Sequence, residues 1–146
     1  ELVESIQRVV DDKKSSESIE INVQIEGDPS SEIQTPITET MAEMVVDNLL
    51  NNALDAVTDE ENPRIQCLFD VTDSFGIEIK DNGCGMDDET LENLLEPFYS
   101  TKNMTHGTGL GMSIVSGIVD QCDGEIQIDS EPGQGTTIRV TLPVFQ

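Results

Sequence analysis

The chain has 146 residues, a length typical of a single domain that buries its own core without disulfide or metal support. Its net charge of -23 argues against nucleic acid or an anionic membrane as a partner, because both require clustered lysine and arginine side chains. The three cysteines form no C-x-x-C pair, which argues against a disulfide framework or a zinc site and favours a cytoplasmic setting. No apolar run approaches the roughly 20 residues that span a bilayer, and we expect the chain to be a piece of a longer protein.

Hydrophobic spacing predicts the secondary structure in chain order. Apolar residues three and four apart predict helices over 1–14, 38–57 and 111–122, and a short helix over 87–95. Alternating apolar residues predict strands over 19–25, 65–71, 75–81, 125–130 and 136–142. Helices gathered beside a mixed, mostly antiparallel sheet predict an α+β fold, a two-layer sandwich, in one domain over 1–146.

The predicted helix over 38–57 carries two asparagines and an acid on one stripe. Asn48, Asn52 and Asp55 share a direction because positions i, i+4 and i+7 do, and Met41 and Met44 lie on the same side. An amide in an apolar stripe needs a partner, or it costs roughly 1 to 3 kcal/mol. Two readings stay open. The amides bond core backbone or lie on a helix edge, or their oxygens hold Mg²⁺ or face phosphate.

On two of the predicted strands, the side that is otherwise apolar carries one polar residue at its end. Asp81 alternates with Ile77 and Ile79, and Thr136 alternates with Ile138, so we expect both side chains on one wall of a pocket. A buried carboxylate accepts hydrogen bonds only, which suits the exocyclic amine of adenine and disfavours guanine. The alternative is that Asp81 caps the turn at Asn82 and Gly83.

A glycine run comes just before the predicted helix over 111–122, where backbone N–H groups form an anion site. The run is Gly107, Thr108, Gly109, Leu110 and Gly111. Such a run is often only a flexible turn, and it is not a P-loop. Between Asp81 and Ile138, only Lys102 and His106 can carry positive charge, against eleven acidic residues. A polyphosphate there must bring Mg²⁺ or use these two side chains, although His106 could equally be a solvated loop residue.

In this order and spacing, the motifs resemble the catalytic ATP-binding domain of sensor histidine kinases, whose Bergerat fold is shared with gyrase, heat-shock protein 90 and MutL. The resemblance covers nearly the whole chain. Its five boxes are the asparagine box 47–53, the first glycine box 81–85 with Gly83 and Gly85, the phenylalanine box at 97–99, the second glycine box 107–111, and Gly133-x-Gly135-Thr136.

The resemblance implies a role for each box. Asn52 coordinates Mg²⁺ with Asn48 in support, Asp81 reads adenine, and Thr136 lines the base pocket. Residues 98–106 resemble the ATP lid, and 97–102 look most like the nitrogen-regulation type, whose short lid carries a comparable lysine. The implied ATP-binding residues outside the glycine run are Asn48, Asn52, Asp55, Asp81, Gly83, Gly85, Phe98, Thr101, Lys102, His106 and Thr136.

Two departures from the family pattern matter. ATPase relatives place a water-activating glutamate four residues before the metal-binding asparagine, where this chain has Asn48. Many histidine kinases place a lysine three residues after that asparagine, where this chain has Asp55. The first departure favours phosphoryl transfer over hydrolysis, and the second leaves more of the charge neutralisation to Lys102.

The resemblance implies a protein histidine kinase of two-component signalling, with ATP and Mg²⁺ as cofactors. The phosphoacceptor histidine belongs to a separate dimerisation hairpin of the same parent, which this sequence lacks, and 1–14 resemble the segment that follows it. The further partner is a response regulator, and the parent is expected to be a homodimer, with the oligomeric state of this piece and the membrane topology of the parent left open. The alternatives are an ATPase of the gyrase branch and a nucleotide-sensing module without turnover.

Overall fold

A computed structural model describes residues 2–16, 19–28, 35–72, 74–89 and 111–144 of the chain. The helices and strands are described in the order in which they occur. They are α1 (Leu2–Ser16), β1 (Glu20–Gly27), α2 (Glu39–Ala56), β2 (Arg64–Val71), β3 (Phe75–Asp81), α4 (Gly111–Gln121), β4 (Glu125–Glu131) and β5 (Gly135–Leu142).

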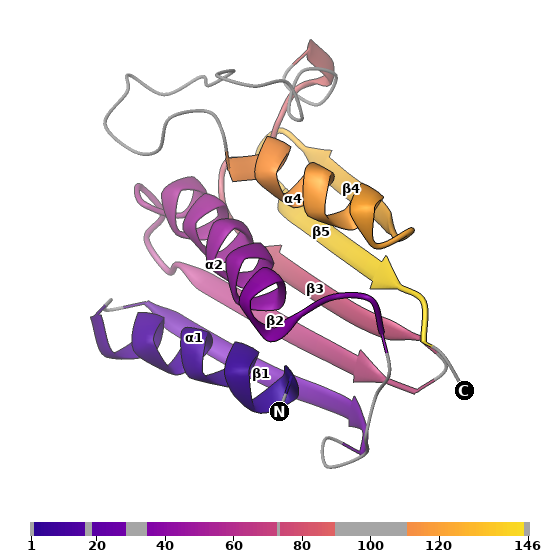
Figure 1. The fold of residues 1–146 in the computed structure, drawn as a ribbon. Helices are drawn as coiled ribbons and strands as arrows, with labels where there is room; N and C mark the ends of the chain where they lie inside the picture. Colours follow the sequence, from indigo (N-terminus) through magenta and orange to yellow (C-terminus); the bar gives the residue numbers. More distant parts are fainter. Residues whose placement is uncertain (1, 17–18, 29–34, 73, 90–110, 145–146) are drawn as a thin grey trace.

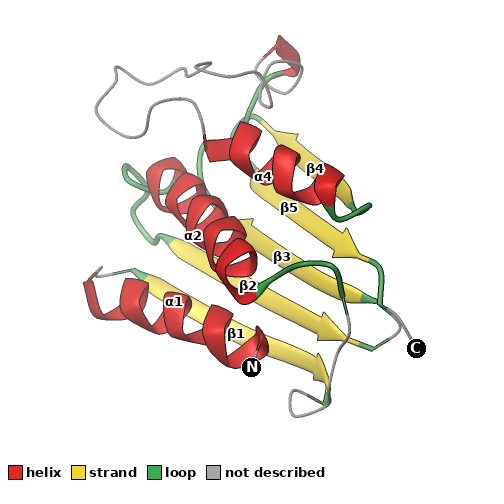
Figure 2. Cartoon of the chain, viewed as in Figure 1, coloured by secondary structure: helices red, strands yellow, loops and turns green. Residues whose placement is uncertain are grey.

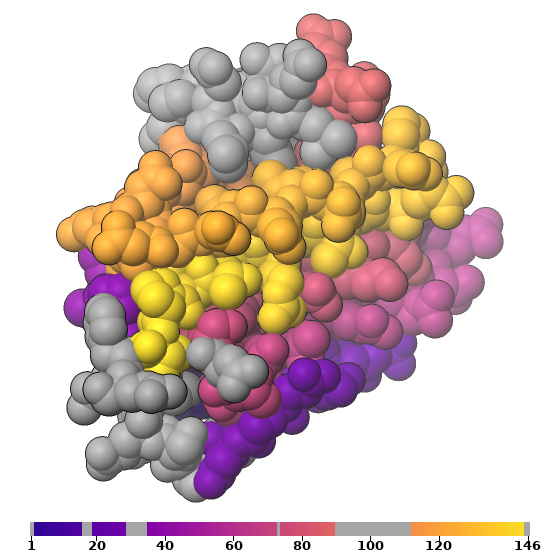
Figure 3. Space-filling model, turned by 90° about the vertical axis from the view of Figure 1, so that its right-hand side faces the viewer, coloured from indigo at the N-terminus to yellow at the C-terminus, as the bar shows by residue number. Residues whose placement is uncertain are grey.

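The strands form one five-stranded sheet in the order β1-β2-β3-β5-β4. β1 pairs with β2 in parallel, whereas the other three pairs are antiparallel. Seen from the side, the colours follow this strand order across the molecule (Figure 3). The mixed, mostly antiparallel sheet that the sequence predicts is therefore confirmed.

Helices α1, α2 and α4 lie side by side on one face of the sheet (Figures 1 and 2). Each helix turns an apolar stripe toward the strands, so the core is the layer between helices and sheet. The largest fully buried side chains come from both layers, and they are Ile6, Val10, Val45, Val46, Leu49, Leu50, Val57, Ile65, Phe69, Phe75, Ile77 and Leu142. In the part of the chain that the structure describes, no helix has both the length and the apolar character of a membrane span.

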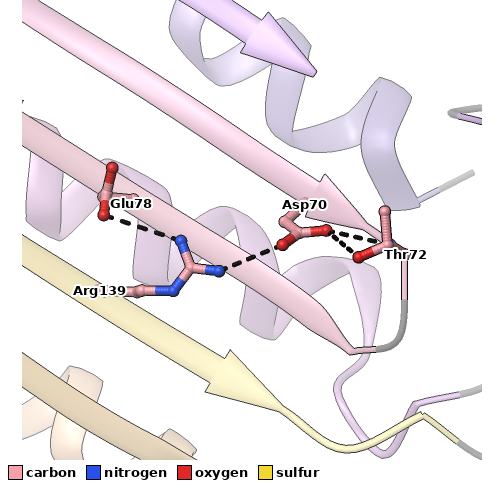
Figure 4. A network of polar contacts seen from close by, with 4 residues as sticks. All are labelled: Asp70, Thr72, Glu78 and Arg139. Carbon is pink, nitrogen blue, oxygen red and sulfur yellow. Dashed lines mark hydrogen bonds and ion pairs between the residues drawn. The ribbon is translucent and has the colours of Figure 1, made fainter. Parts of the chain in front are cut away.

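The other face of the sheet carries a polar network across three strands. The guanidinium of Arg139 on β5 lies 3.3 Å from a carboxylate oxygen of Asp70 on β2 and 3.7 Å from one of Glu78 on β3. Both the backbone N–H and the hydroxyl of Thr72 donate to Asp70, at 3.1 and 2.6 Å. Figure 4 shows this chain of contacts running across the strands, which ties the middle of the sheet together on its solvent side.

The stability of the domain should depend on pH through Asp70. The hydrogen bond from the Thr72 hydroxyl, helped by the Thr72 N–H and by Arg139, lowers the pKa of Asp70. The folded state then binds fewer protons, so the Asp70 contribution is present above the ordinary aspartate pKa of about 3.9 and is lost as pH falls through the lowered value. Urea unfolding should show Asp70→Asn less stable than the parent at pH 7, by less than about 1 kcal/mol, with the gap closing toward pH 3. Thr72→Val should reduce the same pH-dependent difference, and a gap that is constant with pH would refute the assignment.

Gly117, on the exposed side of α4, is a position where a larger residue should stabilise the fold. A Cβ added there meets nothing within 4 Å, and alanine is favoured over glycine inside a helix by roughly 0.5 to 1 kcal/mol. We expect Gly117→Ala to raise the thermal midpoint by about 2 to 4 °C. Gly124→Ala is the contrasting variant, because its Cβ would lie 2.6 Å from Leu142 Cδ2 and should lower the midpoint. Equal shifts in both variants would contradict this account.

Candidate functional site

The asparagine stripe lies along one edge of α2. The residue just before α2 is Thr38, whose hydroxyl accepts a 3.1 Å hydrogen bond from the N–H of Met41 and so caps the first turn. Asn48, Asn52 and Asp55 are each half-buried, while Met44 on the same side is 42% exposed. The amides therefore lie at a helix edge, which is one of the readings that the sequence left open, because the core-facing side of α2 carries Val45, Val46, Leu49 and Leu50. Of the two methionines on this side, Met41 is partly buried against the core and Met44 is exposed.

Asn48 uses its amide nitrogen within its own helix, donating a 2.7 Å hydrogen bond to the carbonyl of Met44. That bond does not involve the amide oxygen, which is the atom that a hard cation requires. Among the described residues, no group of three or more acidic, histidine or cysteine side chains could hold a metal ion. One amide oxygen fits Mg²⁺ as a single protein ligand, because this ion commonly takes only one or two ligands from the protein and the others from phosphate and water.

The other polar residues of the asparagine box face α1 instead. Lys13 on α1 donates a 2.9 Å hydrogen bond to the amide oxygen of Asn51 and lies 3.3 Å from a carboxylate oxygen of Asp47. Asn51 in turn donates to Asp47 at 3.4 Å. The box is thus divided, because Asp47 and Asn51 join α2 to α1, whereas Asn48 and Asn52 lie about 100° further round the helix.

Asp81 and Thr136 are neighbours on the buried face of the sheet. They stand directly opposite one another on β3 and β5, so their side chains project from the same face. Both residues are only 7% exposed, and they are two of the three buried polar residues in the part of the chain that is described. One oxygen of Asp81 accepts a 2.8 Å hydrogen bond from the N–H of Gly83, so the turn-capping bond that the sequence left open is present. A carboxylate has two oxygens and about four acceptor sites, so this bond is compatible with a further donor.

The first glycine box is packed between the end of α2 and the β4–β5 turn. A Cβ at Gly83 would overlap the carbonyl oxygen of Ala56, and one at Gly85 would overlap the carbonyl oxygen of Glu131. Between them, the N–H of Cys84 donates to Ala56 at 3.2 Å, and its carbonyl accepts from Gly133 at 2.7 Å. Only glycine allows the backbone to approach this closely on both sides, so the box fixes α2 and the hairpin around Asp81.

A family model of histidine kinase-, DNA gyrase B- and HSP90-like ATPases matches residues 37–146. The chain belongs to this family. The match begins just before α2 and contains Asn48, Asp81 and Thr136, which are among the described residues that the sequence singles out. It places the chain among ATPase domains and so establishes ATP as the ligand class of this histidine kinase-, gyrase- and HSP90-like domain.

Curated relatives of this ATPase-family domain are named as kinases and as sensor proteins. It is 37% identical over 126 residues to sporulation kinase E of Bacillus subtilis, covering 86% of this chain and 17% of the relative. It is 35% identical over 136 residues to the sensor protein CitS of Halalkalibacterium halodurans, covering 89% of this chain and 25% of the relative. The chain thus spans a quarter or less of the length of these relatives.

Solved structures share the fold of this family member. The mycobacterial sensor histidine kinase MprB matches with a TM-score of 0.78 at 24% identity, covering 97% of this chain and 93% of that one. The catalytic domain of the histidine kinase ThkA matches with a TM-score of 0.75 at 22% identity, covering 97% and 90%. At these identities the likeness concerns the arrangement of helices and strands.

Several of the predicted ATP-site residues lie outside the part of the chain that the structure describes. These predicted residues are Phe98, Thr101, Lys102, His106, Gly107, Thr108, Gly109 and Leu110. The predicted short helix over 87–95 lies mostly outside them as well. Gly111 is the first residue of α4, so the second glycine box ends where a helix starts, as the sequence predicts.

One residue of this region was missed by the sequence reasoning. Ser130 on β4 lies 2.8 Å from the hydroxyl of Thr136 and accepts a 2.8 Å hydrogen bond from the N–H of Met86. The signal that could have found it is phase, because Ser130 alternates with Ile126 and Ile128 as Asp81 does with Ile77 and Ile79. A polar residue that ends the inward side of any strand is therefore a candidate for the site, as Asp81 is.

Proposed function

We propose that this chain is the catalytic ATP-binding domain of a sensor histidine kinase, which supplies the γ-phosphoryl group for phosphorylation of a histidine. The observation that carries the proposal is the stripe of α2, where an amide, Asn48, occupies the position at which ATPase relatives have a water-activating glutamate. Asn48 has no carboxylate to take a proton from water, so the helix favours transfer to an acceptor over hydrolysis. The sensor-kinase relatives support the same reading.

In this proposal the base binds at the middle of the sheet, and the phosphates bind at the edge of α2. Asp81 accepts a hydrogen bond from the adenine amine, while the hydrogen bond from the Gly83 N–H holds the carboxylate in place. Thr136 lines the same wall. Asn52, supported by Asn48, holds Mg²⁺, which neutralises phosphate charge when it is bound. Asp55 lies on the phosphate side, and its negative charge leaves the neutralising role to that ion and to Lys102.

The remaining roles follow from the resemblance. By that resemblance, residues 98–106 correspond to the ATP lid, and Phe98, Thr101, Lys102 and His106 are proposed as ATP-binding residues. By the same resemblance, the second glycine box, 107–111, is proposed to bind the phosphates, and α4 begins at its last residue.

We infer that the whole of 1–146 is one catalytic domain, and that 1–14 follow a dimerisation hairpin that bears the phosphoacceptor histidine. Two contacts support a single domain. β1 pairs with β2 in the one sheet, and Lys13 of α1 donates a hydrogen bond to Asn51 of α2. The parent is a homodimeric kinase whose catalytic domain works in the cytoplasm, and its phosphoryl group passes to a response regulator.

The test combines this chain with Mg-ATP and the histidine-bearing hairpin of its parent. We expect acid-labile phosphohistidine on the hairpin, and none when its histidine is replaced by alanine. Tight ATP binding without transfer to that hairpin would overturn the kinase assignment and favour a nucleotide-sensing module. Hydrolysis by the chain alone that disappears in Asn48→Ala would instead favour the ATPase alternative.

A further inference from the structure

Ser130 on β4 joins three backbone segments through one hydroxyl group. Its Oγ accepts a 2.8 Å hydrogen bond from the N–H of Met86. It also lies 3.1 Å from the carbonyl oxygen of Gly135, to which it can donate, and 2.8 Å from the hydroxyl of Thr136. The segment that follows β3 therefore stays beside the ends of β4 and β5, as Figure 1 also shows.

Ser130 belongs to the same cross-strand row as the two buried polar residues. Thr136 on β5 pairs with Asp81 on one side and with Ser130 on the other. Residues in one row project from the same face, and neighbouring strands lie about 4.8 Å apart. Thr136 is thus the middle member of a polar row whose outer members are a carboxylate and a hydroxyl.

The orientation of the Thr136 hydroxyl depends on that of the Ser130 hydroxyl, because the two groups share one hydrogen bond. Each hydroxyl has one proton to donate. When Ser130 donates to Gly135, the contact at 2.8 Å requires Thr136 to donate to Ser130, and Thr136 then offers only lone pairs to the pocket. When Ser130 instead donates to Thr136, the Thr136 proton is turned elsewhere. The direction of the Ser130 proton therefore decides whether the Thr136 hydroxyl presents only lone pairs or can donate its proton to a purine.

We propose that Ser130 is a positioning residue of the base pocket, which sets the hydroxyl orientation of Thr136 and thereby contributes to discrimination between adenine and guanine. This inference rests on the proposed function, since it places the base beside Asp81 and Thr136. Adenine and guanine present opposite hydrogen-bonding patterns at their six-membered ring edges, so a hydroxyl of fixed polarity favours one of them. Ser130 acts through Thr136 and need not touch the nucleotide.

The experiment measures Mg-ATP and Mg-GTP affinities by calorimetry on the full chain. In Ser130→Ala we expect the preference for ATP over GTP to fall about tenfold, the order of one lost hydrogen bond. In the Thr136→Ala background, adding Ser130→Ala should change the preference no further, because the residue through which it acts is gone. Ser130→Thr, which keeps a hydroxyl, should restore most of the preference. Thr137→Ala, which deletes the next hydroxyl along β5 on the other side of the sheet, should leave it unchanged.

The outcomes separate the two levels of the proposal. An unchanged preference in a folded Ser130→Ala variant would overturn the role of Ser130, as would an equal loss in both backgrounds, which would assign its effect to the Met86 contact alone. If Ser130→Ala does not fold, Ser130→Cys gives the same comparison with a much weaker hydrogen-bonding group. Failure of the parent chain to bind Mg-ATP would instead refute the proposed function.

Discussion

Asp81→Asn should weaken the binding of ATP by about a hundredfold, or roughly 3 kcal/mol. The asparagine can keep the 2.8 Å bond from the Gly83 N–H through its oxygen, because that bond needs only one acceptor. Its amide then presents N–H donors where the adenine amine also has donors. Two donors facing each other in a buried site lose the hydrogen bond and leave both groups unsatisfied.

Calorimetry with ATP and with adenosine measures this effect at the base alone. Both ligands should lose affinity by the same factor, since only the base meets Asp81. Asp129→Asn is the matched control, because it removes the same charge from an exposed position on β4. Nucleotide affinity that survives in Asp81→Asn would remove this residue from the base pocket.

Gly85→Ala should destabilise the domain by about 3 kcal/mol or more and abolish nucleotide binding with it. Gly85 has a φ of +72°, and a Cβ there would overlap the carbonyl oxygen of Glu131 and lie 3.2 Å from the Cα of Pro132. The left-handed conformation costs an alanine roughly 1 to 2 kcal/mol. The overlap with backbone adds more, because neither the box nor the hairpin can move without breaking the bond between Gly133 and Cys84.

Gly133→Ala isolates the two contributions. Gly133 has a similar φ of +79°, yet a Cβ there meets nothing within 4 Å. Denaturant unfolding should therefore show a loss of only about 1 kcal/mol in Gly133→Ala. Equal losses in the two variants would mean that close packing of the glycine box against β4 contributes nothing to stability.

Most of the fold follows from local sequence patterns. The alternation of Phe75, Ile77 and Ile79 defines β3, and the spacing of Val45 and Leu49 defines the buried side of α2, because burial acts directly on each of these residues. The order of the strands does not follow from local patterns. The parallel pairing of β1 with β2, and the place of β5 between β3 and β4, depend on long-range packing. The sequence predicts only that the sheet is mixed.

The candidate site was predictable where polarity interrupts a periodic pattern. Asp81 and Thr136 are found by this reasoning, since an inward polar residue at the end of a strand stands out. The division of the asparagine box was not predictable, because Asp47, Asn48, Asn51 and Asn52 are equally polar and only the position of Lys13 on α1 separates them. The exposure of Met44 was also missed, since hydropathy does not state which side of a helix has a neighbour.

The pairing of β3 with β5 has a consequence for the order in which the domain assembles. It closes a loop over residues 82–135, whereas the β4–β5 hairpin closes over only 132–134. Long loops lose more chain entropy on closure and are formed more slowly than local hairpins. The row that holds Asp81 and Thr136 exists only after the long loop has closed. A partly folded chain can therefore contain the hairpin and α2 without a base pocket, and nucleotide binding reports on the pairing of β3 with β5.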